Sequence, residues 1–397
     1  MIIHTTKFKT HIISLRFKEP IKKAHLGYRA LLPQLMASQS PLYNSRTKLS
    51  EALEDLYGAT LTSSTNRQGL MSVVYFNIHF ISPKFSNEPL LDKVLTLLHD
   101  VVYGHKDLPK AEFETEKRIA IEHIMAQKNN KTNYAVSRLF EIMFENDDYA
   151  LKVQGDIEDI KQVSYQRLNT YYKKEFLNNS LDIVLSGEFS EADKQLINHY
   201  FKQQKGDVIM IDYNDKQHAY QEVIETDDIA QAKLNIGYLL PIRFKDDQFY
   251  EASIFNIILG AGVHSRLFLN VREKHSLCYY IRSQYDPFKG FIFVYSGVDK
   301  QRVDLALKVI DEQVKDLQEN LITDDELLFS KQSYINAIKE NEDSQVRQMD
   351  SFYQQTLLDL DPIDVMIEKI NAVTKEQVRN VAKQLKKDTL YILAPEV

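Results

Sequence analysis

Histidines and acidic residues three or four positions apart on one helix face are the side chains that bind a catalytic metal ion. The chain has eleven histidines, but neither H-x-x-E-H nor H-E-x-x-H occurs in it. The nearest match is residues 119–123, where Glu122 and His123 keep the last two positions and Ile119 replaces the first histidine. Adjacent helical residues point about 100° apart, so this pair is a poor chelate and a solvated helix face is favoured. An enzyme that uses Glu122 and His123 as unrecognised ligands is the alternative.

Motifs for nucleophilic and phosphate chemistry are weak. Cys278 has His275 three residues before it across a predicted turn, an unusual geometry for a dyad, so a small residue packed at a strand start is favoured. Gly260 and Gly262 lack the lysine and the third glycine of a phosphate-binding loop and are typical of a turn between helices. G-x-S-x-G is absent. The sequence therefore predicts neither a nucleophile nor a phosphate loop.

Residues 259–280, LGAGVHSRLFLNVREKHSLCYY, hold the best candidates for polar chemistry. The pattern predicts a glycine turn, a helix over 265–273 and a strand that starts near residue 277. Arg272 lies near the end of this helix and Tyr279 near the start of the strand. A reversal of the chain between them would bring the guanidinium and the phenol to one wall. The residues alone favour the simpler alternative, a surface arginine and a strand tyrosine.

Length, composition and charge exclude several classes of protein. At about 150 residues per domain, 397 residues predict two or three domains. The chain is 44% apolar and 26% charged, which is typical of a folded soluble protein, and its net charge of −7 disfavours binding to nucleic acid or an anionic membrane. The single cysteine cannot form an internal disulfide, and no run of about 18 apolar residues could span a membrane. The N-terminal segment carries lysines where a signal peptide would have an apolar core. We expect a cytoplasmic, soluble protein.

Hydrophobic periodicity predicts a similar order of elements in each half of the chain. The first half has a strand, two helices, a hairpin, four helices and a closing strand, at residues 7–17, 29–37, 48–56, 59–65, 71–81, 88–102, 110–127, 135–144, 164–175 and 181–186. The second half has a strand, two helices, a hairpin, four helices and a closing strand, at residues 233–240, 250–259, 265–273, 278–283, 291–298, 302–318, 324–339, 345–358, 375–385 and 390–394.

Two landmarks indicate that the halves are a duplication. Val163 precedes a helix and the closing strand of the first half, and Val373 precedes the same pair in the second half, an offset of 373 − 163 = 210 residues. Thr374 and Gln377 have the spacing of a capping box. We expect an α+β fold with two duplicated domains, 1–210 and 211–397, each a mostly antiparallel sheet with helices on one face. The polar stretch 203–231 is the predicted linker.

The segment that carries Arg272 and Tyr279 resembles a family signature. Its pattern, LG-x-G-x-x-SRLF followed by RE-x-x-x-L-x-Y, resembles the C-terminal domain of the pitrilysin/insulinase metallopeptidases (inverzincins), which include the mitochondrial processing peptidases. Residues 53–59 (LEDLYGA) and the closing strand with Gly187 and Glu188 are similar to the N-terminal domain of the same family. The resemblance covers nearly the whole chain. It implies two duplicated domains whose sheets enclose a peptide-binding chamber.

The chain departs from this family at the zinc motif. Active members carry H-x-x-E-H about twenty residues before the segment that resembles 53–59, and Leu31, Gln34 and Leu35 stand at its two histidines and glutamate. Leucine has no lone pair to give a metal, and glutamine is not a carboxylate base. Glu122 is the candidate for a vestigial distal ligand. The resemblance therefore implies that this chain holds no zinc and that a partner chain carries it.

The chain retains the arginine and the tyrosine of the family signature, as Arg272 and Tyr279. The resemblance implies that the arginine binds a substrate carbonyl or carboxylate oxygen and that the tyrosine hydroxyl stabilises an oxyanion. The chain is similar to the silent subunit of two-chain bacterial members, which implies a peptide substrate and a heterodimer with an H-x-x-E-H chain. A homodimer is left open. The alternative function is a non-hydrolytic structural or peptide-binding homologue in which the pair is a relic.

Overall fold

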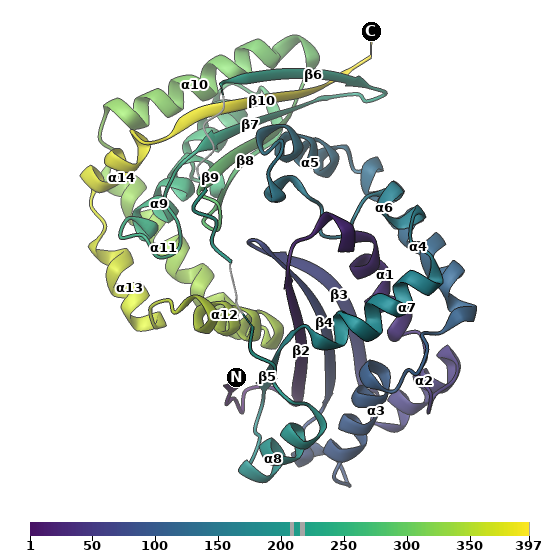
Figure 1. Ribbon diagram of the computed structural model, residues 1–397. Helices are drawn as coiled ribbons and strands as arrows, with labels where there is room; N and C mark the ends of the chain where they lie inside the picture. The colour runs from purple at the N-terminus through teal and green to yellow at the C-terminus, as the bar shows by residue number, and fades with distance from the viewer. Residues whose placement is uncertain (207–209, 215–218, 397) are drawn as a thin grey trace. The chain divides into compact units, whose positions relative to one another are not determined.

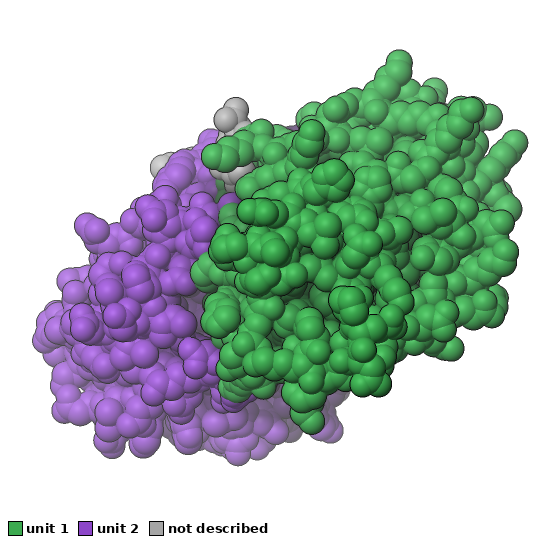
Figure 2. All heavy atoms as spheres, turned by 90° about the horizontal axis from the view of Figure 1, so that it is seen from below, with its two compact units in different colours: residues 1–125, 151–210, 345–353 green, residues 126–150, 211–344, 354–397 purple. Residues whose placement is uncertain are grey.

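The computed structural model describes residues 1–206, 210–214 and 219–396. Their contacts divide the chain into two compact units (Figure 2). Unit 1 comprises residues 1–125, 151–210 and 345–353, and unit 2 comprises residues 126–150, 211–344 and 354–397. The chain thus changes unit near residue 210, but the segments 126–150 and 345–353 each belong to the unit built mainly by the other half.

Unit 1 contains a five-stranded sheet in the order β1-β5-β2-β4-β3 (Figure 1). Its strands are β1 (Ile2–Ile3), β2 (Thr10–Pro20), β3 (Thr60–Gln68), β4 (Met71–Ile81) and β5 (Ser180–Ser186). Only β1 and β5 are parallel, and the other three pairings are antiparallel. The unit's helices are α1 (Leu26–Met36), α2 (Arg46–Asp55), α3 (Leu91–Tyr103), most of α4 (Lys110–Asn129), α6 (Ile157–Lys161), α7 (Tyr165–Lys174) and α8 (Glu191–Tyr200).

Unit 2 contains a second five-stranded sheet, in the order β6-β10-β7-β9-β8 (Figure 1). Its strands are β6 (Gln221–Asp227), β7 (Ala232–Leu239), β8 (Cys278–Asp286), β9 (Phe291–Val298) and β10 (Lys386–Pro395). Here only β6 and β10 are parallel. The helices of this part are α5 (Lys131–Met143), α9 (Phe249–Asn256), α10 (Val303–Glu319), α11 (Asp324–Glu340), α12 (Gln345–Leu358, whose first nine residues belong to unit 1), α13 (Ile363–Ala372) and α14 (Lys375–Ala382).

The two sheets confirm the predicted fold class and duplication. Subtracting five from each strand number of the second sheet gives the order of the first, 1-5-2-4-3. The closing strands β5 and β10 hold equivalent places beside the one parallel neighbour of each sheet. Thr374 and Gln377 form the expected capping box at the start of α14. The duplicated topology therefore follows from a repeated sequence pattern.

One face of each sheet carries the main core, and the other carries one helical segment. Leu15 and Phe17 of β2 pack with α1 and α3 in the core of unit 1, whereas Arg16 between them points to the second face and pairs with Asp350 of α12. In unit 2, Gly237 of β7 lies on the second face, where the α5 side chain of Met143 packs on it. The two exchanged segments are thus the elements that cover the second faces.

The predicted linker at 203–231 is wrong for part of its length. Residues 221–227 form β6, which pairs along its whole length with β10, and Gln204 bridges to Leu181. Residues 207–209 and 215–218 of the predicted linker lie outside the described residues. The stretch was misread because β6 is an edge strand whose residues alternate between half-buried and exposed, so its sequence is mostly polar. Helices α6, α8 and α13 were also not predicted.

Among the residues that the structure describes, every helix is too short or too polar to cross a lipid bilayer.

Candidate functional site

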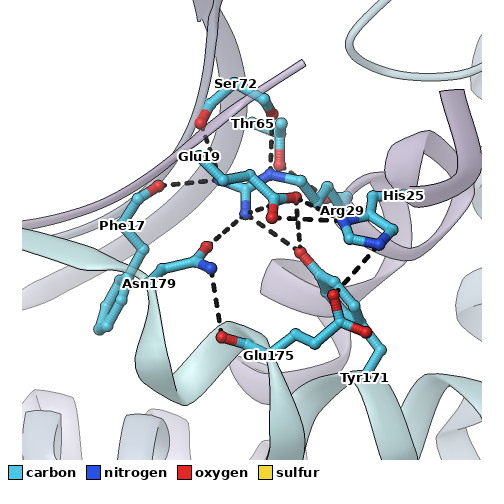
Figure 3. Close-up of polar contacts among 9 residues, drawn as sticks. All are labelled: Phe17, Glu19, His25, Arg29, Thr65, Ser72, Tyr171, Glu175 and Asn179. Atoms are coloured by element: carbon cyan, nitrogen blue, oxygen red, sulfur yellow. Dashed lines mark hydrogen bonds and ion pairs between the residues drawn. The ribbon is translucent and has the colours of Figure 1, made fainter. Parts of the chain in front are cut away.

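Helix α1, which carries the positions of the zinc motif, is fixed at its first turns by a buried arginine (Figure 3). Arg29 is only 1% exposed, and all five of its N–H groups donate hydrogen bonds. The acceptors are the hydroxyl and carbonyl oxygens of Ser72, the carbonyl of Phe17, the amide oxygen of Asn179 and the hydroxyl of Tyr171, at 2.6–3.2 Å. This fan of bonds ties α1 to β2, β4 and α7.

A carboxylate and a histidine complete this network. Glu19 Oε1 lies 3.3 Å from the Arg29 guanidinium, accepts the Tyr171 hydroxyl at 2.9 Å and lies 3.1 Å from Nδ1 of His25. The other ring nitrogen of His25 lies 3.2 Å from Glu175. Burial raises the pKa of the Glu19 carboxyl, but the His25 contact and the Arg29 charge outweigh burial and hold that pKa below its ordinary value. The charged groups of this network are thus paired with one another, and the network has a structural role.

The degenerate motif positions lie on α1 directly after this anchor. Leu31 and Leu35 are fully buried in the core of unit 1. Gln34 is exposed, and its amide exchanges two hydrogen bonds with Ser63 of β3, from Nε2 to the carbonyl at 3.1 Å and from the hydroxyl to Oε1 at 2.7 Å. The two positions at which the family resemblance places the histidines are thus core positions, and the residue at the position of the glutamate links α1 to β3.

The candidate distal ligand does not face these positions. Glu122 and His123 are exposed on α4, whereas their neighbours Ile121 and Ile124 pack against the core. Glu122 forms an ion pair with Arg118 one helical turn away, at 2.7 Å. In the part of the chain that the structure describes, no three histidine, cysteine or acidic side chains gather into a possible metal site. The residues present therefore do not fit a catalytic zinc ion.

Arg272 and Tyr279 lie in unit 2, at the end of a π-helical turn and at the start of β8. The turn spans Phe268–Lys274, and the Arg272 guanidinium lies 4.6 Å from the centre of the Phe268 ring. Its one ion pair among the described residues is a loose contact of 3.7 Å with the adjacent Glu273. Tyr279 lies at an irregularity of the β8–β9 pairing and is 75% exposed. A bulge of this kind re-aims a side chain, here outward.

Among the described residues, neither Arg272 nor Tyr279 has a strong polar partner. Burial raises the pKa of the Cys278 thiol, and the positive charge of Arg272 acts in the opposite direction. No hydrogen bond joins Arg272 to Tyr279 among the described residues, and the tyrosine hydroxyl has no protein partner there. Both groups are therefore accessible to a ligand. His275 is exposed and makes no contact with Cys278, so a dyad is not formed.

Comparison with known proteins gives the family. The family profile of the peptidase M16 inactive domain matches residues 162–334. The "Probable inactive metalloprotease YmfF" of Bacillus subtilis is 30% identical over 402 residues, covering 99% of this chain and 94% of that protein. The chain belongs to the M16 peptidase family. The resemblance to the pitrilysin/insulinase metallopeptidases is confirmed, and the chain is an M16 metalloprotease-like protein of the inactive type.

Solved structures agree with this fold. A conserved protein from Enterococcus faecalis superimposes with a TM-score of 0.93 at 25% identity, over 100% of this chain and 96% of that one. A peptidase M16 inactive domain from Pseudomonas fluorescens superimposes with a TM-score of 0.81 at 18% identity, over 100% and 95% of the two chains. This M16 chain therefore has the family's two-domain fold along its whole length.

Sequence reasoning missed the buried network around Arg29. A signal for it exists, because Arg29 is the one charged residue in the otherwise apolar helix α1, LGYRALLPQLM. A charge in such a position is buried only when it is paired. Its partners Tyr171 and Asn179 lie more than 140 residues away, so the sequence does not reveal them.

Proposed function

We propose that this M16 chain is the catalytically silent subunit of a two-chain zinc peptidase. It would supply Arg272 and Tyr279 as a wall that binds substrate, while a homologous chain with H-x-x-E-H carries the zinc. The observation that supports this proposal is a contrast in exposure. The former ligand positions Leu31 and Leu35 are buried in the core. Tyr279 is exposed, Arg272 is half-buried, and neither has a strong partner among the described residues.

An exposed tyrosine and a weakly paired arginine have a clear chemical use in peptide hydrolysis. The Tyr279 hydroxyl can donate a hydrogen bond to an oxygen that becomes negative as the peptide bond is attacked. The planar fork of Arg272 can hold a carbonyl or carboxylate oxygen of the substrate by two parallel hydrogen bonds. Packing against Phe268 restricts the guanidinium, which reduces the entropy lost when it binds. Neither residue needs a metal of its own for these roles.

Two conservative substitutions test the proposal in the mixed complex of this chain with an H-x-x-E-H homologue. Tyr279→Phe removes one hydroxyl, and loss of one oxyanion donor typically lowers kcat by about 10²–10³. Arg272→Lys keeps the charge but loses the fork, so it is expected to lower kcat/KM as well. Complex formation, zinc content and melting temperature are expected to stay unchanged, because Tyr279 is exposed and Arg272→Lys keeps the charge that forms the loose pair with Glu273.

Matched exposed residues serve as controls. Tyr220→Phe changes another half-exposed tyrosine of unit 2, and Arg167→Lys changes an exposed arginine of unit 1, so both variants are expected to keep full turnover. If Tyr279→Phe keeps kcat within about twofold of wild type, the complementing-subunit proposal is wrong. The alternative, a non-hydrolytic peptide-binding or structural homologue, then takes its place.

A further inference from the structure

Beside α5, which covers part of it, the second face of the sheet in unit 2 carries aromatic and basic side chains. The register of β7, β9 and β8 aligns Lys233, Gly297 and Tyr280 in one row and Asn235, Tyr295 and Arg282 in the next. The flanking residues Leu234, Val294 and Ile281 all lie in the core of unit 2. Because side chains alternate along a strand, the two rows face away from that core. We refer to Lys233, Tyr280, Arg282 and Tyr295 as the basic face.

The contacts of neighbouring residues hold the Lys233 side chain in a defined position on this face. Gly297 lies between Lys233 and Tyr280, and a Cβ at that position would lie 2.8 Å from the Tyr280 ring, so only glycine lets the ring lie flat on β9. The ammonium group of Lys233 lies 5.6 Å from the centre of this ring. Thr132 of α5 holds the Tyr280 hydroxyl at 2.8 Å. The lysine is thus held over a fixed aromatic platform.

The two cations of the basic face lack carboxylate partners. Within the described part of the chain, neither Lys233 nor Arg282 forms an ion pair, although Arg282 is exposed and Lys233 is half-buried. Burial lowers the pKa of Lys233, which shows that its environment does not compensate its charge.

Nearby carboxylates are already engaged elsewhere. Glu225 pairs with Arg138 at 2.6 Å, and Asp227 pairs with Lys131 at 2.5 Å. Asp286 of β8 accepts the hydroxyl of Tyr149. Among the described residues, no carboxylate pairs with either cation of the basic face.

We propose that the basic face binds an extended peptide segment whose acidic side chains pair with Lys233 and Arg282. This proposal deepens the proposed function, because it names acidic peptides as the substrate class. The two cations lie two strand spacings across and two residues along the sheet, about 12 Å apart between Cα atoms. An extended chain covers that distance in about three to four residues, which sets the spacing of the two acidic residues. Tyr280 and Tyr295 offer apolar surface to the residues between them.

Binding by the isolated full chain tests this proposal without the zinc-bearing partner. The probe is a twelve-residue peptide that carries two glutamates four positions apart and an uncharged fluorophore. The control peptide is identical except that glutamine replaces both glutamates. Fluorescence anisotropy is expected to show the glutamate peptide binding at least about fivefold more tightly, since each exposed ion pair changes an affinity by up to about fivefold. The difference is expected to shrink with added salt, because salt screens exposed charges.

Charge-matched variants make the result specific. The double variant Lys233→Gln/Arg282→Gln is expected to bind both peptides equally, and Lys233→Arg/Arg282→Lys is expected to keep the preference and shows that the site still folds. The control Arg167→Gln/Lys308→Gln removes the same net charge from exposed positions elsewhere and is expected to change nothing.

Three outcomes overturn the proposal. They are equal binding of the two peptides by wild type, unchanged preference in Lys233→Gln/Arg282→Gln, and no measurable binding of the glutamate peptide. None of them bears on the turnover test with Tyr279→Phe, so failure here is distinguishable from failure of the complementing-subunit proposal.

Discussion

Units 1 and 2 share one sheet topology but differ in the chemistry of their second faces. In unit 1, Arg16 pairs with Asp350 of α12 at 2.6 Å, and Lys18 pairs with Asp182. In unit 2, α5 docks through aromatic rings, with Phe140 lying 5.3 Å from Phe291 and 4.9 Å from Phe293 between ring centres. On the second face of unit 1, Arg16 and Lys18 each have a carboxylate partner. On the second face of unit 2, Lys233 and Arg282 have none among the described residues.

Helix α1, which follows β2 in unit 1, and helix α9, which follows β7 in unit 2, also differ in whether polar or aromatic contacts hold them. Arg29 and its acceptors fix α1 in unit 1, whereas Phe249 at the start of α9 in unit 2 packs against the rings of Phe244 and Tyr250. In unit 1, the buried polar groups around Arg29 thus serve as structural contacts. In unit 2, the cations Lys233, Arg272 and Arg282 have no close ion pair among the described residues. This difference is why we place the ligand-binding role in unit 2.

The largest expected effect is on the stability of unit 1. Arg29→Met removes five hydrogen bonds and leaves Glu19 without its arginine, and breaking such a buried pair costs about 3–5 kcal/mol in the free energy of unfolding. Urea unfolding measures the loss, and hydrogen exchange is expected to place it in unit 1. Arg167→Met, at an exposed site, is expected to stay within about 0.5 kcal/mol. A loss below 1 kcal/mol for Arg29→Met would show that the network is not a structural anchor.

A smaller effect is expected from mild acid, again in unit 1. Burial lowers the pKa of four histidines there, His11, His79, His99 and His105. An unfolded histidine has a pKa of about 6.5, so as the pH falls below that value the unfolded chain takes up protons before the folded one does. The stability of unit 1 is therefore largest above about pH 6.5 and declines as the pH falls through the lowered folded values.

Unfolding at pH 7.5 and 5.5 measures this decline, and His105→Gln is expected to flatten it because His105 is only 7% exposed. His264→Gln, at an exposed site of unit 2, is expected to leave the slope unchanged. Equal acid sensitivity of the two units in hydrogen exchange would contradict the assignment to unit 1.

Local patterns predicted most of the fold. Alternation and helical periodicity located the two hairpins, the closing strands and most helices, and a capping box at Thr374 marked the start of α14. The exchange of 126–150 and 345–353 between the units was not predictable, because an amphipathic pattern shows that a face is buried but not against which sheet. Strand β6 was missed because an edge strand needs few apolar residues.

The site was predictable only where a motif survives in the sequence. The replacement of ligands at Leu31, Gln34 and Leu35 is visible because the family pattern around them is intact. That the leucines are core residues and that Gln34 bonds to Ser63 depends on β3 packing against α1, which local sequence does not specify. The basic face needed the strand register, since Lys233 and Arg282 are 49 residues apart in sequence and share a face only through β9.

The central claim is that the chemistry is divided between two chains, and one measurement tests it most directly. Peptide hydrolysis and zinc content are measured for this chain alone, for the H-x-x-E-H chain alone and for their mixture. The account predicts turnover in the mixture well above that of either chain, with less than about a tenth of an equivalent of zinc in this chain, since Leu31, Gln34 and Leu35 supply no ligand. Turnover by this chain alone with stoichiometric zinc, or a mixture no faster than the H-x-x-E-H chain alone, would contradict it.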